Sequence, residues 1–153
     1  MTLPSPNCLI SVTEAGSAPT LLLDTHTFVW WTTGSSELPP ATVRLIVDAP
    51  IVAVSLVSLW EIVLKEATPR PMIGAANAER WFAEAMSATD FKLLPIEARH
   101  IGAVQMLPMH HRDPFDRLLI AQAKLSGHSV VTRDRAFVDY GIDVFWPTEQ
   151  GGR

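Results

Sequence analysis

The chain has 153 residues, of which 48% are hydrophobic and 18% charged, with 16 acidic side chains, 12 basic ones and a formal net charge of −4. This length and apolar fraction predict a single folded domain and exclude a disordered chain. The net acidity excludes a protein that holds nucleic acid by a broadly basic surface, because neutralising many phosphates requires many Lys and Arg side chains.

The start of the chain and its cysteine content predict the compartment. Cys8 is the single cysteine and cannot form an intrachain disulfide, which fits a reducing environment. The first residues lack the basic segment and apolar stretch of a signal peptide. No run approaches the roughly 20 apolar residues of a membrane helix. We therefore expect a cytoplasmic protein with no membrane segment.

Apolar runs and helical periodicities predict the elements in chain order. Residues 1–19 hold three prolines and predict an irregular N-terminal arm, followed by a domain at 20–147 and a tail at 148–153. Within the domain, strands are expected at 21–24, 51–54, 91–96, 129–132 and 142–145, and helices at 25–31, 39–48, 55–67, 76–88, 97–106, 113–126 and 135–140. Gly127 stands where a left-handed helix C-cap is expected.

This alternation of apolar strands and helices predicts the fold class. Parallel strands need crossover connections, which are usually helices, so the pattern favours an α/β/α sandwich with about five short parallel strands. Ligands of such folds bind outside the carboxyl ends of the strands. Acidic residues at those ends are therefore the candidate functional residues.

Carboxylates stand at or just beyond several predicted strand ends, and we expect them to converge at one edge of the sheet. Because converging carboxylates repel, they must be protonated or neutralised by a cation. A ligand set made only of oxygen favours Mg²⁺ or Mn²⁺, and such ions promote phosphodiester hydrolysis. The residues concerned are Asp24, Glu61, Asp116 and Asp134, with Asp113 beside them.

Each acid also has a purely structural interpretation. For Asp113 we favour the role of helix N-cap over that of ligand, and for Asp134 capping and ligation are equally weighted. Glu61 could lie on a solvated helix face, although its neighbours are apolar. Asp24 is the hardest to explain structurally, because a charge next to a buried strand is costly unless it is paired or bound to metal.

Four segments together resemble the PIN-domain family and, more narrowly, the VapC-type toxins of type II toxin–antitoxin pairs. They are residues 21–31 (LLLDTHTFVWW), 54–62 (VSLVSLWEI), 111–123 (HRDPFDRLLIAQA) and 131–134 (VTRD). The resemblance covers about residues 20–146.

The resemblance implies an endoribonuclease that depends on Mg²⁺ or Mn²⁺, is held inactive by a cognate antitoxin and is commonly a homodimer. Asp24, Glu61, Asp116 and Asp134 match the acidic positions of the family, and Asp113 is an auxiliary ligand or a cap. We expect Asp24 and Asp116 to bind the tighter metal directly. Glu61 would hold the attacking water, and Asp134 would act through water or on a second ion.

RNA contacts require cations near the acids. The candidates are Arg112, Arg133 and Arg135, with His110, His111 and Lys65 behind them. Arg133 could instead pair with Asp113 or Asp116, and for Arg117 a solvated or salt-bridged role is favoured.

The aromatic and imidazole side chains are interpreted as mainly structural. Trp60 is expected in the core, whereas Trp30 or Trp31 could lie in a dimer or antitoxin groove. The histidines treated as structural are His26, His100 and His128.

Two other function classes stay open. The first is a catalytically silent module of the same fold that binds RNA or a partner protein. The second is another acid-dependent α/β protein, a phosphatase or a phospho-receiver. The segment after Asp24 lacks the second Asp that an aspartate-nucleophile phosphatase places two residues on, and no lysine follows a late strand as a receiver requires.

Overall fold

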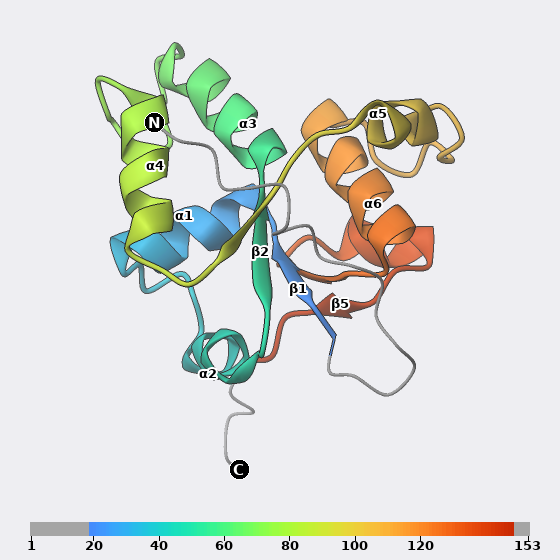
Figure 1. The fold of residues 1–153 in the computed structure, drawn as a ribbon, viewed down its shortest axis with the longest axis horizontal. Coiled ribbons are helices and arrows are strands. Elements are labelled where there is room, and N and C mark those ends of the chain that lie inside the picture. The colour runs from blue at the N-terminus through green and yellow to red at the C-terminus, as the bar shows by residue number, and fades with distance from the viewer. Residues whose placement is uncertain (1–18, 149–153) are drawn as a thin grey trace.

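A computed structural model of the protein describes residues 19–148 (Figure 1). The predicted arm at 1–19 and the predicted tail at 148–153 therefore lie almost entirely outside the described residues. None of the helices between residues 19 and 148 combines the length and the apolar character needed to cross a bilayer.

The centre of the fold is a parallel sheet in the order β3-β2-β1-β4-β5 (Figure 1). Its strands are β1 (Leu21–Leu23), β2 (Val52–Ser55), β3 (Lys92–Leu94), β4 (Ser129–Val131) and β5 (Val144–Phe145). In the register, Leu22 of β1 lies opposite Ala53 on one side and Val130 on the other. The predicted parallel sheet of about five short strands is confirmed.

Helices cover both faces of this sheet. They are α1 (Thr25–Thr33), α2 (Pro40–Asp48), α3 (Leu56–Glu66), α4 (Ala78–Ser87), α5 (Ala98–Val104) and α6 (Pro114–Ser126), together with the 3₁₀ helix η2 (Arg135–Tyr140). In Figure 1, α1, α3 and α4 lie to one side of β1 and β2, and α5 and α6 lie to the other. The predicted α/β/α sandwich is therefore confirmed.

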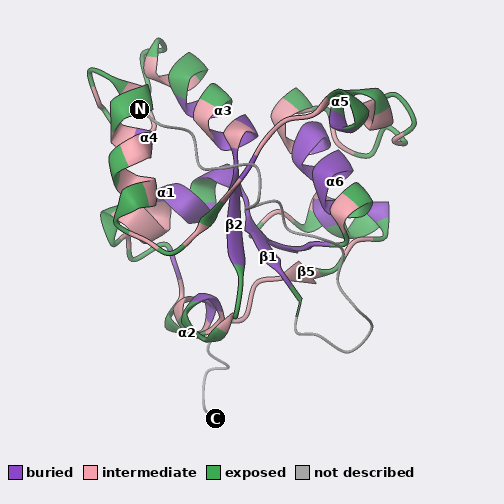
Figure 2. Ribbon diagram, in the orientation of Figure 1, coloured by how far each residue is buried: buried purple, intermediate pink, exposed green. Residues whose placement is uncertain are grey.

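The alternation of side chains along β1 divides the core in two. Leu22 packs with residues of α5, α6 and η2, whereas Leu21 and Leu23 pack with residues of α1, α3 and α4. All three leucines are buried, as are β2 and the inner face of α6 (Figure 2). A strand buried on both faces reads as a continuous apolar run, which is why the sequence identified β1 directly.

Several element boundaries differ from the prediction by one or two residues. The strand expected at 91–96 covers only Lys92–Leu94, and it ends before Pro95, which has no N–H to donate. The last strand covers only Val144–Phe145. The helix C-cap predicted at Gly127 is confirmed, with a left-handed φ of 66°.

The prediction that Trp60 belongs to the core is wrong. Its side chain is 48% exposed, and its ring meets the edge of Phe115 with centroids 4.8 Å apart. Helix α3 is amphipathic, and Val57, Ser58 and Ile62 are its fully buried residues. Trp60 lies about 200° around the helix from both Ser58 and Ile62, which leaves its side chain half exposed.

Arg117 is a buried side chain, not the solvated or salt-bridged residue expected from the sequence. It is 8% exposed, and its guanidinium donates at 2.8–3.3 Å to the hydroxyl of Tyr140 and to backbone carbonyls. The carbonyls belong to Val104, Leu107, Pro108 and His111. Arg117 thereby fixes the segment that connects α5 to α6.

We expect Arg117→Met to lower the free energy of unfolding by about 2–5 kcal/mol, because it leaves buried carbonyls without a donor. The quantity is measured by urea denaturation. Arg112→Ala is the matched control, since Arg112 is exposed and a surface substitution of this kind usually changes stability by less than about 0.5 kcal/mol. Equal stability of the two variants would contradict the structural role of Arg117.

Candidate functional site

The candidate site lies at the switch point of the sheet, where successive strands begin to be added on the opposite side of β1. From β1 the chain adds β2 and β3 on one side and later places β4 and β5 on the other. Crevices outside the carboxyl ends of strands at such a switch point are the usual ligand sites of α/β folds. Here Asp24 and Asp134 line a cavity of about 200 Å³.

Asp24 follows β1 directly and is 8% exposed. Its Oδ1 accepts a hydrogen bond from the backbone N–H of Thr27 at 2.8 Å, so it caps α1, and its Oδ2 accepts one from the hydroxyl of Thr132 at 2.6 Å. Burial raises the pKa of Asp24, although these hydrogen bonds oppose the shift. The carboxylate is held rigidly at the edge of the sheet.

Thr132 connects the two strand ends of the site. Its Oγ1 donates to Asp24 and accepts a hydrogen bond at 3.0 Å from the backbone N–H of Asp134. Asp134 in turn caps η2 through Oδ1, which accepts from Ala136 N at 2.9 Å. Asp134 therefore has the expected capping role, and its Oδ2 is left for other partners.

Glu61 approaches the site from α3 and is 3% exposed. Its Oε1 pairs at 2.7 Å with the Nζ of Lys65 one helical turn on, whereas its buried Oε2 has no hydrogen-bond partner among the described residues. The pKa of Lys65 is raised: burial lowers it, but the hydrogen bond and charge of Glu61, together with the charges of Asp113 and Asp116, outweigh burial. An oxygen left without a donor in a buried position is costly unless another group binds it.

The first turn of α6 carries two carboxylates with different tasks. Asp113 is the N-cap, as favoured from the sequence, since its Oδ1 accepts from the N–H groups of Phe115 and Asp116 at 2.9 and 3.2 Å. Burial, followed by the charge of Asp113, raises the pKa of Asp116 to about 7, and Glu61 and Asp24 add to the shift. The predicted acids are therefore close enough to repel one another.

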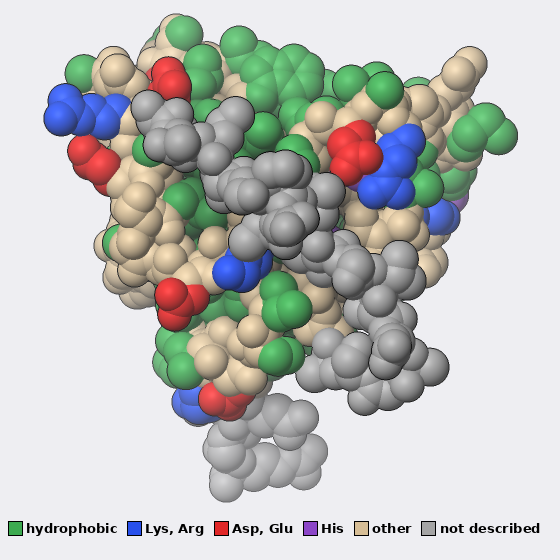
Figure 3. Space-filling model, viewed as in Figure 1, with side chains coloured by type: hydrophobic (Ala, Val, Ile, Leu, Met, Phe, Trp, Pro, Cys, Tyr) green, Lys and Arg blue, Asp and Glu red, His purple; other side chains and the backbone are tan. Residues whose placement is uncertain are grey.

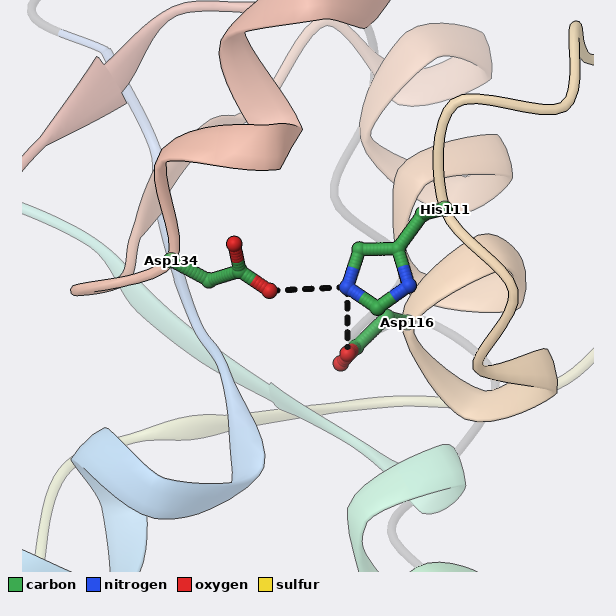
Figure 4. Close-up of side chains that lie close together, drawn as sticks. All are labelled: His111, Asp116 and Asp134. Atoms are coloured by element: carbon green, nitrogen blue, oxygen red, sulfur yellow. Dashed lines mark hydrogen bonds and ion pairs between the residues drawn. The ribbon is translucent and has the colours of Figure 1, made fainter.

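His111 stands between two of these acids (Figure 4). Its Nε2 lies 3.0 Å from Asp116 Oδ2 and 2.7 Å from Asp134 Oδ2. The ring itself is anchored by Phe137, whose centroid is 6.0 Å away in an edge-on arrangement. The backbone N–H of His111 donates to the hydroxyl of Tyr140 at 2.7 Å.

The hydrogen bond at Nδ1 of His111 shows which of the two ring nitrogens carries the proton. Nδ1 of His111 accepts a hydrogen bond at 3.1 Å from the backbone N–H of Asp113, so Nδ1 carries no proton. The proton of the neutral ring is therefore on Nε2, which donates to Asp116 and Asp134. In this arrangement His111 donates to the two carboxylates. The carboxylate oxygens are then the atoms that would bind a cation.

The donor set fits a hard divalent cation. Three features support the fit: the unpartnered Oε2 of Glu61, the mutual repulsion that raises the pKa of Asp116, and the oxygen character of the ligands. One carboxylate oxygen of Asp116 and one of Asp134 lie within 4.8 Å of each other and of the His111 ring nitrogen that donates to them. Asp24 and Glu61 extend this cluster toward β1 and α3.

The predicted arginines surround the site in different ways. Arg112 and Arg135 are exposed, and the structure gives neither guanidinium a partner among residues 19–148. Arg133 does not pair with Asp113 or Asp116: it donates to Glu37 Oε2 at 2.8 Å and lies 4.6 Å above the ring of Trp30. Its alternative role as a bridge to those acids is therefore wrong.

The three histidines interpreted as structural from the sequence do not all fit that role. His100 and His128 are buried, and burial lowers the pKa of both, which agrees with their structural interpretation. His26 is exposed and lines the same cavity as Asp24, so that interpretation does not fit it.

Sequence reasoning underestimated two residues of the site. The sequence places His111 only among the cations behind the arginines and gives Thr132 no role. A His two residues before a helix N-cap and a Thr after a buried strand are weak signals, because the contacts of His111 with Asp134 and of Thr132 with Asp24 join residues far apart in the sequence.

Comparisons with known proteins agree with this fold. A family model described as the PIN domain matches residues 21–142. A chain of the VapBC2 structure from Rickettsia felis bound to a promoter DNA fragment is 13% identical, with a TM-score of 0.61 over 82% of this chain and 97% of that chain. A chain of a toxin–antitoxin complex from Klebsiella pneumoniae is 22% identical, with a TM-score of 0.58 over 85% and 99% of the two chains.

A chain of the FitAcB structure from Neisseria gonorrhoeae is 17% identical, with a TM-score of 0.58 over 82% of this chain and 96% of that one. At these identities the structural likeness shows the fold. A comparison with curated proteins gives no match.

We expect Asp113→Asn to lower the pKa of Asp116 from about 7, because the charge of Asp113 is the largest cause of the shift after burial. The asparagine oxygen can still cap α6, so the helix is retained. The pKa is measured by following the carboxyl ¹³C shift of Asp116 against pH. Asp139→Asn, an exposed acid on η2, should leave it unchanged; the same pKa in all three proteins would refute the proposed coupling.

Proposed function

The chain belongs to the PIN domain family, and from that premise we propose that it is a Mg²⁺- or Mn²⁺-dependent endoribonuclease, a toxin neutralised by a cognate antitoxin. The observation that carries the proposal is that the Oδ2 atoms of Asp116 and Asp134 lie 3.0 and 2.7 Å from one nitrogen of His111, while the charges of Asp24, Glu61 and Asp113 act on Asp116. Carboxylates gathered in this way are stable together only with a cation or a proton between them.

The acids would hold the cation, and their rigid attachment is the contribution of the protein. Asp24 and Asp116 are fixed by hydrogen bonds to Thr132 and His111, and Glu61 brings an oxygen that has no other partner. A bound divalent cation would supply a polarised phosphoryl oxygen and a more acidic attacking water. Asp134, 42% exposed at its side chain, would act at the open rim of the site, through water or on a second ion.

Cationic side chains near the rim would hold the RNA phosphates. Arg112 and Arg135 are exposed beside the acids, and Arg133 is pinned above Trp30. On the face shown in Figure 3, the coloured Lys and Arg side chains are scattered among acidic ones and form no continuous basic surface. We therefore propose that RNA is held by a few local contacts and the metal site.

An antitoxin partner and a homodimer are part of the same proposal. Trp60, Val63 and Leu64 are 48%, 44% and 49% exposed and form an apolar stripe on α3 at helical spacing. Of the structural relatives, the one from Rickettsia felis is described as VapBC2 and the one from Klebsiella pneumoniae as a toxin–antitoxin complex. An apolar segment of a partner, laid along this stripe, would cover it.

The purified protein is expected to cleave RNA with Mg²⁺ or Mn²⁺ and to lose this activity in EDTA. Asp24→Asn and Asp116→Asn should each lower the cleavage rate by at least about 100-fold, because each removes a charged oxygen ligand. The rate is measured on a panel of labelled RNAs by gel electrophoresis. Asp48→Asn, an exposed acid on α2, is the control and should cleave as the wild type does.

The alternative of a catalytically silent module makes the opposite prediction. Wild-type protein that cleaves none of the RNAs with either metal, and that does not arrest growth when expressed, would rule out the ribonuclease proposal in favour of a binding module.

His111 is proposed as a positioning residue for Asp116 and Asp134. We expect His111→Ala to weaken Mn²⁺ binding by about 10- to 100-fold, because the two carboxylates lose their shared donor. In His111→Gln an amide N–H can take the place of Nε2–H, so much of the affinity should return. Isothermal titration with Mn²⁺ measures both without any cleavage assay. If the alanine variant binds as tightly as the wild type, the positioning role is wrong.

A further inference from the structure

The acidic cavity has a neighbour on the other side of two aromatic side chains. His26 and Trp30 line the cavity of about 200 Å³ that contains Asp24 and Asp134, and both also line a second cavity of about 470 Å³. Their ring centroids are 5.6 Å apart at an angle of 49°. This aromatic pair is therefore a shared wall between the two cavities.

The second cavity has the opposite chemical character. Besides the aromatic pair, its wall includes the cations Lys65 and Arg70 and the apolar side chain of Met72, and none of its described lining residues is acidic. Its volume is within the range of roughly 300–1,000 Å³ that holds small ligands. A compartment of this kind suits a ligand with a flat apolar ring and a negative charge.

The two cations of this cavity are not equally free. Lys65 is paired with Glu61 at 2.7 Å, so its charge neutralises one of the acids of the candidate site. Arg70 is exposed, and its guanidinium has no partner among residues 19–148. Arg70 is thus the cation available to an anionic ligand.

The aromatic wall is held in place from the side of the acids. The guanidinium of Arg133 lies 4.6 Å from the ring centroid of Trp30, and Glu37 holds that guanidinium at 2.8 Å. The ring of Trp146 is also close to Trp30, with the ring centroids 6.1 Å apart. His26 is exposed, so its ring is available for stacking.

We propose that the cavity lined by His26, Trp30, Lys65, Arg70 and Met72 binds the unpaired nucleotide next to the cleaved phosphate. The base contacts the His26 and Trp30 rings and Met72, and its phosphate pairs with Arg70. This inference rests on the proposed ribonuclease function and assigns a nucleotide-binding role to the second cavity, on the far side of the aromatic wall from Asp24 and Asp134. A base-paired nucleotide could not present its face to the wall, because that face is stacked in a duplex.

The proposal is tested in the inactive Asp116→Asn background, so that binding is separated from cleavage. A short fluorescein-labelled single-stranded RNA, and the same RNA in a duplex, are titrated by fluorescence anisotropy. We expect preference for the single strand. His26→Ala should weaken single-strand binding by roughly 5- to 100-fold, as stacking on one aromatic ring predicts, and His26→Phe, which keeps a ring, should restore it.

Arg70→Ala should weaken binding. It should also make the slope of log affinity against log salt concentration shallower by about 1, the contribution of one phosphate contact. Arg80→Ala is the matched control: Arg80 is also exposed, but it lines a separate cavity on α4 and pairs with Glu84. In the otherwise wild-type enzyme, Arg70→Ala should raise KM with little change in kcat.

Single-strand affinity that is the same in wild type, His26→Ala and Arg70→Ala would overturn the nucleotide site even if the enzyme cleaves RNA. If those variants instead lose affinity for a partner protein while oligonucleotide binding is unchanged, the cavity belongs to the partner. Absence of cleavage by wild type, by contrast, would contradict the proposed function itself.

Discussion

Carboxylates held at the carboxyl edge of one parallel sheet repel each other, and the surrounding structure compensates each of them separately. Asp24 receives hydrogen bonds from Thr27 and Thr132, Glu61 is paired with Lys65, and His111 donates to Asp116 and Asp134. The compensation is incomplete, because the pKa of Asp116 is still raised to about 7 and one oxygen of Glu61 has no donor. Such a residual cost at a cleft is typical of a functional site, where the missing partner is a ligand.

Stability and site geometry are coupled through the segment between α5 and α6. Arg117 is buried beneath this segment and donates to its carbonyls, and the same segment carries His111. The hydroxyl of Tyr140 joins them, because it binds both the guanidinium of Arg117 and the backbone N–H of His111. The imidazole is therefore positioned by the core of the domain and does not depend on the conformation of a free loop.

The net charge of −4 acquires a different meaning once the two cavities are distinguished. The acidic cavity is suited to a cation, and the adjoining cavity supplies cations and aromatic surface of its own. A nucleic-acid strand that crosses the wall of His26 and Trp30 would meet the two kinds of chemistry in succession. An acidic protein can in this way hold RNA at a few places without a broadly basic surface.

The sequence by itself determined the alternation of strands and helices, the parallel sheet and the convergence of Asp24, Glu61, Asp113, Asp116 and Asp134. These follow from local rules: buried strands are continuous apolar runs, and the carboxyl ends of parallel strands meet at one edge. The partners of Arg117, Arg133 and His111 and the exposure of Trp60 were decided only by the tertiary structure. Each depends on which surfaces of distant segments come together, as when Asp134 reaches His111 from 23 residues away, and no local pattern encodes that distance.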